Sequence, residues 1–298
     1  MATQHPERII EGNGIEICSD AFGDPADPCI LLVMGAGSSM LMWEVDLCQR
    51  LADGGRFVIR YDNRDTGRTT SCPPGEPNYT LADMAADGVA VLDAYGIDRA
   101  HIAGASMGGM ITQLIGLNHP ERVLTLTPIM STPNPGATLE AADAFESGAH
   151  GQSLSPPAPK ILEAIGAMAG VDWTDRDSVI AVQVQMFRAL AGSKYPDDGS
   201  LGEDFFAADF DRSISYASSF NHGPAIAQSE PWDHRLKDLD VPTLVIHGND
   251  DPILPYDHGQ ALHAAIPGAK LLTMDGVGHE LPRPIWDEVI AAILDHTS

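Results

Sequence analysis

Short apolar runs alternate with longer amphipathic stretches along most of the chain. Six runs indicate buried strands, at residues 29–34, 56–61, 99–105, 123–129, 242–247 and 269–274. Stretches with apolar residues at helical spacing lie near 41–53, 80–95, 107–118, 257–266 and 284–296. An N-terminal hairpin is expected in the segment ERIIEGNGIEICSDAFG. The alternation predicts an α/β fold with a mostly parallel sheet flanked by helices on both faces.

The alternation is interrupted between residues 131 and 236. Turn-rich segments such as STPNPGAT, SLSPPAPK and YPDDGS separate helical patterns there, with little that resembles a buried strand. An insertion of this length is more typical of a lid than of a structureless loop. We therefore expect a core formed by residues 1–130 and 237–298, with an inserted helical cap at 131–236.

The expected cap carries many methionine and aromatic side chains. They are Met168, Met186, Phe187, Phe205, Phe206, Phe210, Tyr216 and Phe220. Such flexible and aromatic surface is sufficient to line an apolar pocket, although part of it must hold the cap together.

Composition narrows the classes of partner. The chain of 298 residues has a formal net charge of −25, from 42 acidic and 17 basic residues. This surface repels nucleic-acid phosphates and anionic membranes, and the longest apolar runs are too short to span a bilayer. We expect no nucleic-acid or membrane partner. The polar N-terminus has no secretory pattern, so a cytoplasmic location is predicted.

The four cysteines, Cys18, Cys29, Cys48 and Cys72, have no paired spacing. They are expected to be reduced structural thiols rather than disulfide or zinc ligands.

The segment HIAGASMGGM places Ser106 at the junction of a predicted strand and a predicted helix. In a G-x-S-x-G elbow, a serine lies on a strained turn, and glycines are needed where strand and helix approach closely. Gly104, Gly108 and Gly109 meet that need. The Met107 N–H, at the helix N-terminus, is the natural donor to an oxyanion. A glycine-rich turn with an incidental serine is the alternative.

A serine nucleophile needs a histidine base oriented by a carboxylate. Asp250 and Asp251 follow one predicted strand, and His279 follows the next one with a glycine-containing turn between. The chain order of serine, aspartate and histidine is the one expected for a nucleophile elbow in an α/β sheet. The carboxyl ends of parallel strands meet at one edge, where sites form.

The sequence positions of four other histidines indicate structural roles. His101 begins the strand before Ser106, His247 ends a strand with its side chain packed, and His258 and His263 are expected on a solvated helix face. A metal site built from the last three would need carboxylate ligands at helical spacing that are not evident.

Together these motifs resemble the α/β-hydrolase superfamily, from FGDPADPCILLVMGAG through GASMGGM and VPTLVIHGNDDPILP to GVGHELP. Within it, RDTGR, VLDAYGIDRAHI and SMGGMITQ are similar to small esterases of the aclacinomycin methylesterase type. Epoxide hydrolases and haloalkane dehalogenases resemble the same fold but use an aspartate where Ser106 stands.

The resemblance implies roles for several residues. Gly248 and Pro255 frame Asp251 in the family pattern G-x-x-D-x-x-x-P, so Asp251 rather than Asp250 matches the acid. The oxyanion loop matches Met34 to Gly37, where the family usually begins His-Gly, and Ala36 would donate the second backbone N–H. The implied catalytic set is Ser106, Asp251 and His279, with Ala36 and Met107 as oxyanion donors.

The implied activity is hydrolysis of a carboxylic ester through an acyl-enzyme, without metal or organic cofactor. The substrate would be an apolar small-molecule ester, such as the methyl ester of a bulky apolar or polyketide-type compound. The same triad could serve C–C bond hydrolysis, acyl transfer or perhydrolysis, and a non-catalytic ligand-binding protein on this scaffold is the alternative of another class.

Two further motifs are interpreted as structural. GAGSSM partly imitates a dinucleotide-binding turn, but its third glycine and a following acidic residue at the required distance are missing. DNRDTGR is expected to form a turn in which Arg64 and Asp65 pair with each other.

Overall fold

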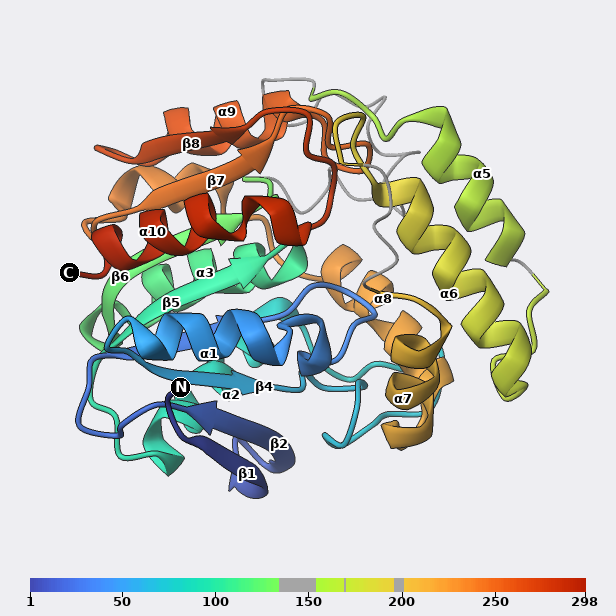
Figure 1. Cartoon of the computed structure of the whole chain (residues 1–298), viewed down its shortest axis with the longest axis horizontal. Coiled ribbons are helices and arrows are strands. Elements are labelled where there is room, and N and C mark those ends of the chain that lie inside the picture. Colours follow the sequence, from blue (N-terminus) through green and yellow to red (C-terminus); the bar gives the residue numbers. More distant parts are fainter. Residues whose placement is uncertain (134–153, 169, 196–200) are drawn as a thin grey trace.

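The computed structural model describes residues 1–133, 154–168, 170–195 and 201–298, and within these residues eight strands form one sheet (Figure 1). The strands are β1 (Gln4–Gly12), β2 (Ile15–Phe22), β3 (Cys29–Val33), β4 (Phe57–Tyr61), β5 (Ala100–Ala105), β6 (Val123–Ile129), β7 (Leu244–Gly248) and β8 (Lys270–Met274). Their order in the sheet is β1-β2-β4-β3-β5-β6-β7-β8. β1 and β2 form the antiparallel N-terminal hairpin, and all pairs from β4 to β8 are parallel. The predicted α/β fold is confirmed.

Helices cover both faces of the sheet. They are α1 (Val45–Asp53), α2 (Leu81–Ala94), α3 (Met107–Asn118), α9 (Tyr256–Ala265) and α10 (Trp286–His296). α1 and α10 pack on one face, and α2, α3 and α9 pack on the other (Figure 1). Within β3, Ile30 and Leu32 join the first packing layer and Leu31 joins the second, because successive side chains of a strand point to opposite faces. A strand apolar at every position is therefore buried on both sides.

The predicted elements agree with the structure to within one or two residues at most ends. The helix expected at 41–53 begins later, because Met40–Met42 form a 3-10 turn and α1 starts at Val45. The buried Arg60 guanidinium donates to the carbonyls of Met40 and Trp43, and the Met40 carbonyl also accepts the Trp43 N–H of the 3-10 turn. Further 3-10 turns occupy Pro120–Arg122, Tyr216–Asn221 (η5), Asp233–Asp238 and Arg283–Ile285.

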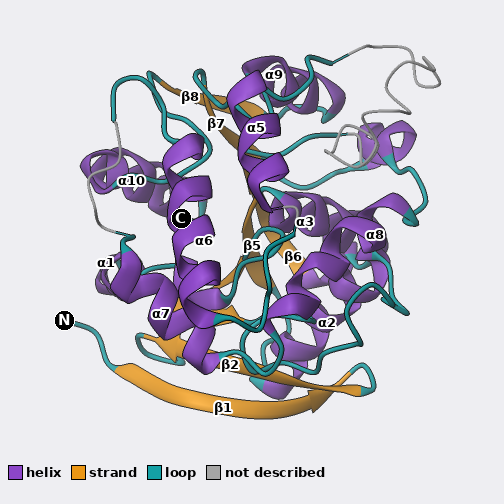
Figure 2. Cartoon of the chain, turned by 90° about the vertical axis from the view of Figure 1, so that its right-hand side faces the viewer, coloured by secondary structure: helices purple, strands orange, loops and turns teal. Residues whose placement is uncertain are grey.

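The described part of residues 131–236 contains helices and no strand. Its α-helices are α5 (Pro159–Met168), α6 (Arg176–Leu190), α7 (Glu203–Arg212) and α8 (His222–Ala227). They lie together beyond one end of the sheet strands (Figures 1 and 2). Residues 134–153, 169 and 196–200 of the expected cap lie outside the described residues. The boundaries of the cap at 131 and 236 remain predictions.

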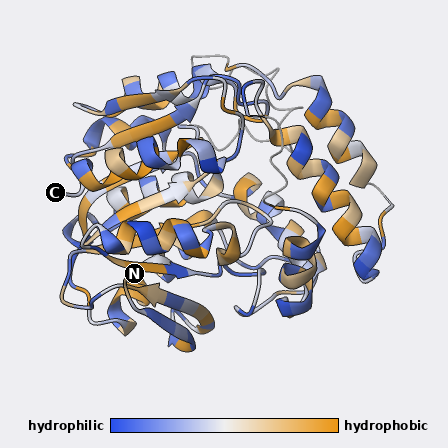
Figure 3. Cartoon of the chain, viewed as in Figure 1, coloured by the Kyte–Doolittle hydropathy of each residue, from blue (hydrophilic) through white to orange (hydrophobic). Residues whose placement is uncertain are grey.

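Helices α5 and α6 have alternating hydrophobic and hydrophilic positions, seen as orange and blue bands in Figure 3. Ile180 and Val184 of α6 pack with Phe206 of α7 in a small apolar cluster separate from the layers on the sheet. Among the described residues, no helix is both long enough and apolar enough to cross a membrane.

Candidate active site

Ser106 lies on a sharp turn between β5 and α3. Its backbone has φ 56° and ψ −119°, in the left-handed half of conformational space that side chains disfavour. Neighbouring groups hold this conformation, since the Ser106 N–H donates to the Ile129 carbonyl at 2.8 Å and the Ser131 hydroxyl donates to the Ser106 carbonyl at 2.9 Å. A strained residue that its surroundings hold in place is typical of a functional site.

The glycines around Ser106 are required by close backbone contacts. A Cβ on Gly104 would lie 2.2 Å from the Gly108 oxygen, and one on Gly108 would lie 2.1 Å from the Val33 oxygen. These distances are far below van der Waals contact. The turn is therefore compact because β3, β5 and α3 meet there without intervening side chains.

Asp251 and His279 are joined by a hydrogen bond. The His279 Nδ1 lies 2.7 Å from the Asp251 Oδ2, and the Asp251 side chain is fully buried. The other carboxylate oxygen, Oδ1, accepts the backbone N–H groups of Ile253 and Leu254, each at 2.9 Å. The carboxylate is thus fixed from both sides, and it fixes the orientation of the imidazole.

The electrostatics of this pair favour a basic imidazole. Burial disfavours the charged form of His279, but the adjacent Asp251 carboxylate outweighs burial, and the pKa of His279 is raised above its usual value of 6.5. Asp250 does not contact His279. Its carboxylate instead accepts hydrogen bonds from the backbone N–H and the hydroxyl of Ser193.

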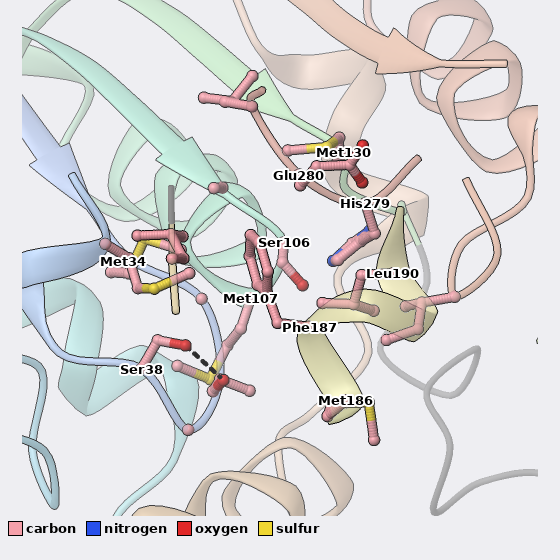
Figure 4. Close-up of a pocket in the computed structure, with 18 of the residues that line it drawn as sticks. Met34, Ser38, Ser106, Met107, Met130, Met186, Phe187, Leu190, His279 and Glu280 are labelled. Carbon is pink, nitrogen blue, oxygen red and sulfur yellow. Dashed lines mark hydrogen bonds between the residues drawn. The ribbon is translucent and has the colours of Figure 1, made fainter. Parts of the chain in front are cut away.

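Ser106 and His279 face each other across a cavity (Figure 4). No hydrogen bond joins their side chains within the described part of the chain. Such a bond is often long or poorly aligned before substrate binds, so the facing arrangement is compatible with proton transfer from the hydroxyl to the imidazole.

The two predicted oxyanion donors belong to segments that adjoin Ser106. Met107 begins α3, and the loop after β3 passes so close that a Cβ on Gly35 would lie 3.0 Å from the Ser106 Cβ. Among the described residues, the N–H groups of Ala36 and Met107 donate no hydrogen bond to the protein. Free amides at a helix N-terminus and in an adjacent loop can stabilise an oxyanion.

The cavity has a volume of about 410 Å³ and a mainly apolar lining. Seven methionines contribute to it: Met34, Met42, Met107, Met110, Met130, Met168 and Met186. Its aromatic lining residues are Trp43, Phe187, Tyr195, Phe206, Phe220 and Trp286. Of the eight side chains singled out in the expected cap, five line the cavity. Phe205, Phe210 and Tyr216 instead pack against neighbouring aromatic rings.

Glu280 and His222 line the cavity, and neither of them was singled out from the sequence. Glu280 follows His279 directly and is buried, with its Oε1 accepting the Gly192 N–H at 3.2 Å. His222 begins α8 and contacts the loop after β3. Glu280 could have been found from its position directly after His279. No local sequence pattern distinguishes His222.

Two structural expectations were wrong. Arg64 pairs with Asp87 at 2.5 Å rather than with Asp65, because Asp65 has φ 65° and turns its carboxylate towards the Tyr79 hydroxyl. His258 is fully buried rather than solvated, since its ring nitrogens contact the Thr132 hydroxyl and the Ser155 carbonyl, both at 3.0 Å.

His101 and His247 fit the structural roles expected of them. His101 contacts the Thr125 hydroxyl at 3.0 Å, and His247 contacts the Leu254 carbonyl at 2.8 Å. His263 is half-buried on α9. Within the residues that the structure describes, no group of three or more potential ligands could hold a metal ion.

Known proteins resemble this chain over nearly its whole length. It is 33% identical to rhodomycin D methylesterase DnrP of Streptomyces peucetius, and 33% identical to rhodomycin D methylesterase DauP of Streptomyces sp. (strain C5), over 98% of both chains in each case. The enol-lactonase from Burkholderia xenovorans LB400 has a similar solved structure, with a TM-score of 0.74, 20% identity and coverage of 97% of this chain and 99% of that one. The model of the alpha/beta hydrolase fold family matches residues 28–282. With this sheet order, elbow and family match, the chain belongs to the alpha/beta hydrolase fold family.

Proposed function

We propose that this protein is a serine esterase that hydrolyses the methyl ester of a bulky, apolar, polyketide-type compound through an acyl-enzyme on Ser106. The observation that carries the proposal is the strained Ser106 turn, which faces the His279 imidazole hydrogen-bonded at 2.7 Å to the buried Asp251. A hydroxyl becomes nucleophilic when such a base takes its proton.

In the proposed cycle, His279 removes the proton from the Ser106 Oγ as this oxygen attacks the ester carbonyl carbon. The tetrahedral oxyanion accepts hydrogen bonds from the N–H groups of Ala36 and Met107. Asp251 stabilises the imidazolium, which then gives its proton to the departing alkoxide, releasing methanol. Water, deprotonated by His279, attacks the acyl carbon next, and collapse of the second intermediate returns the proton to Ser106 and releases the acid.

The cavity supports an apolar substrate. Its volume of about 410 Å³ is within the range for drug-sized ligands, and flexible methionines beside aromatic rings suit a large planar acyl group. Among the described lining residues there is no lysine or arginine, while Glu44 and Glu280 are acidic. An uncharged ester is therefore favoured, and the carboxylate product meets no cation that would retain it.

The two relatives from Streptomyces support the reaction. Both are named for methyl ester cleavage on rhodomycin D, and they align with 98% of this chain. Because the fold alone does not fix the substrate, the proposal extends to the class of ester and not to one compound.

The test combines turnover and labelling. Hydrolysis of p-nitrophenyl acetate and butyrate is measured for the wild type and for Ser106→Ala, with Ser71→Ala as the control. Ser71 lies in a loop after β4 and does not line the cavity. Intact mass after a fluorophosphonate then identifies the nucleophile. We expect activity and a single label on the wild type and on Ser71→Ala, and neither on Ser106→Ala.

Substrate class is tested by acid release from three esters: the methyl and tert-butyl esters of a polycyclic aromatic carboxylic acid, and methyl acetate. We expect the polycyclic methyl ester to have the highest kcat/KM. A wild type that neither turns over nor takes the label would overturn the esterase and favour a ligand-binding protein on this scaffold. If Ser106 is labelled but kcat/KM is equal for all three esters, only the proposed substrate class is overturned.

A further inference from the structure

The loop after β3 is held by a histidine that lies far away in the sequence. The Gly37 N–H donates to the Nδ1 of His222 at 2.9 Å, across a separation of 185 residues. Gly37 has φ 70°, and nothing lies within 4 Å of where its Cβ would be, so glycine here serves the backbone conformation. The peptide unit that carries this N–H follows Ala36 directly. Its orientation therefore constrains the Ala36 backbone.

The partners of His222 determine its protonation. The Nδ1 faces an N–H, which can only donate, and the Nε2 lies 2.6 Å from the Arg64 carbonyl, which can only accept. The ring is therefore neutral, with its proton on Nε2. It is 1% exposed, and burial lowers the pKa of His222, in agreement with the neutral form. Both ring nitrogens are used by the backbone, so neither is left for a substrate.

Hydrogen bonds of the preceding residue hold the backbone that carries the His222 ring. The preceding residue, Asn221, donates from its Nδ2 to the Asp65 carboxylate at 3.0 Å and to the Pro73 carbonyl at 3.1 Å. Its Oδ1 accepts the Gly75 N–H at 2.6 Å. The start of α8 is thereby attached to the turn after β4, and His222 joins that turn to the loop after β3.

We propose that His222 is a positioning residue of the oxyanion hole, holding Gly37 so that the Ala36 N–H points to the oxyanion above Ser106. This inference rests on the proposed esterase function. His222 touches no reacting atom and acts through the Gly37 peptide. Once that hydrogen bond is lost, the Ala36 amide samples other orientations, and its stabilisation of the transition state declines more than substrate binding does.

Two variants separate the two hydrogen bonds of the ring. In His222→Asn, the amide oxygen can take the position of Nδ1 and accept from Gly37, whereas the contact with the Arg64 carbonyl is lost. In His222→Gln, the amide nitrogen can take the position of Nε2 and donate to Arg64, whereas the acceptor for Gly37 is lost. Each variant loses one buried hydrogen bond, so similar losses of thermal stability are expected.

The two variants are expected to differ in kcat. Because removal of a whole oxyanion donor typically costs about 10²–10³ in kcat, misorientation of one donor in His222→Gln should lower kcat by about 10- to 100-fold. Its KM should change less than about threefold. A trifluoromethyl ketone, which forms an oxyanion on the serine, should bind more weakly by a factor similar to the loss in kcat. His222→Asn should keep kcat within about threefold of the wild type.

A measurement independent of turnover follows the Gly37 amide itself. Its hydrogen exchange should be slow in the wild type and in His222→Asn, and faster in His222→Gln. Equal kcat in the two variants, or loss in His222→Gln with unchanged inhibitor affinity, would overturn the positioning role. A wild type without turnover or fluorophosphonate label would overturn the esterase proposal first. Labelled wild-type Ser106 with indistinguishable variants would overturn only the role of His222.

Discussion

The hydrogen bonds of the two Asp251 carboxylate oxygens predict how the substitution Asp251→Asn will lower activity. The Oδ1 accepts two backbone N–H groups, from Ile253 and Leu254, each at 2.9 Å. An asparagine oxygen must occupy that position, since placing its NH₂ there would oppose two buried donors at about 1–3 kcal/mol each. The NH₂ group then faces the Nδ1 of His279, where the carboxylate oxygen lay 2.7 Å away.

This arrangement forces His279 into the wrong tautomer. A donor facing Nδ1 requires that nitrogen to accept, so the ring proton moves to Nε2, which then cannot take the proton of Ser106. Loss of the correct tautomer costs about 10⁴-fold in kcat in enzymes with this constellation, equivalent to about 5.5 kcal/mol in the activation free energy. Stability should change little, because the two N–H groups keep their acceptor.

The assay is steady-state hydrolysis of p-nitrophenyl butyrate with thermal melting of the same samples. Asp250→Asn is the matched control, since the same substitution one residue earlier affects only the contact with Ser193. We expect the control to keep kcat within a few-fold of the wild type. Asp251→Asn with more than about a tenth of wild-type kcat, or a control that loses as much, would refute the reasoning.

Three further predictions concern pH and packing. The pKa of His279 is raised above 6.5. As the proposed base, His279 must be neutral, so kcat/KM should fall as pH decreases, with the midpoint above 6.5. A midpoint below about 6 in a pH–rate profile would contradict this. Burial raises the pKa of Glu280 from 4.5 to about 7. Its ionisation therefore opposes folding as pH rises from 4.5 to 7, and Glu280→Gln should remove about 3 kcal/mol of this loss, measured by urea unfolding at pH 4 and 8. Gly108→Ala would place its Cβ 2.1 Å from the Val33 oxygen, so it should prevent folding or destabilise the protein by several kcal/mol. Gly166→Ala has nothing within 4 Å of its Cβ and should be neutral or stabilising by up to about 1 kcal/mol. Equal melting temperatures of the two variants would contradict this.

Much of the fold could be predicted from local pattern. A strand such as β3 is buried on both faces, so each of its five residues is apolar, and this composition is visible without knowledge of the neighbours. The late start of α1 was missed; just before it, the carbonyls of Met40 and Trp43 accept hydrogen bonds from Arg60 of β4. That contact depends on strand pairing and leaves no trace in the helical pattern.

The candidate site divides in the same way. The glycines around Ser106 mark a turn whose steric demands are local, so the elbow was predicted in place. Charged neighbours were less informative, because Arg64 and Asp65 are adjacent in the sequence yet have different partners, Asp87 for the first and Tyr79 for the second. Adjacent side chains on a turn point in different directions, and their partners come from other elements.

The sequence by itself determined the class of fold, the elbow at Ser106 and the strand ends that carry Asp251 and His279. Only the tertiary structure decided that Asp250 turns to Ser193, that Glu280 is buried, and that His222 holds the loop after β3. The physical reason is the range of the interactions. Hydrophobic periodicity and glycine sterics act over a few neighbouring residues, whereas a hydrogen bond across 185 residues exists only after the sheet and the helices beyond it have packed.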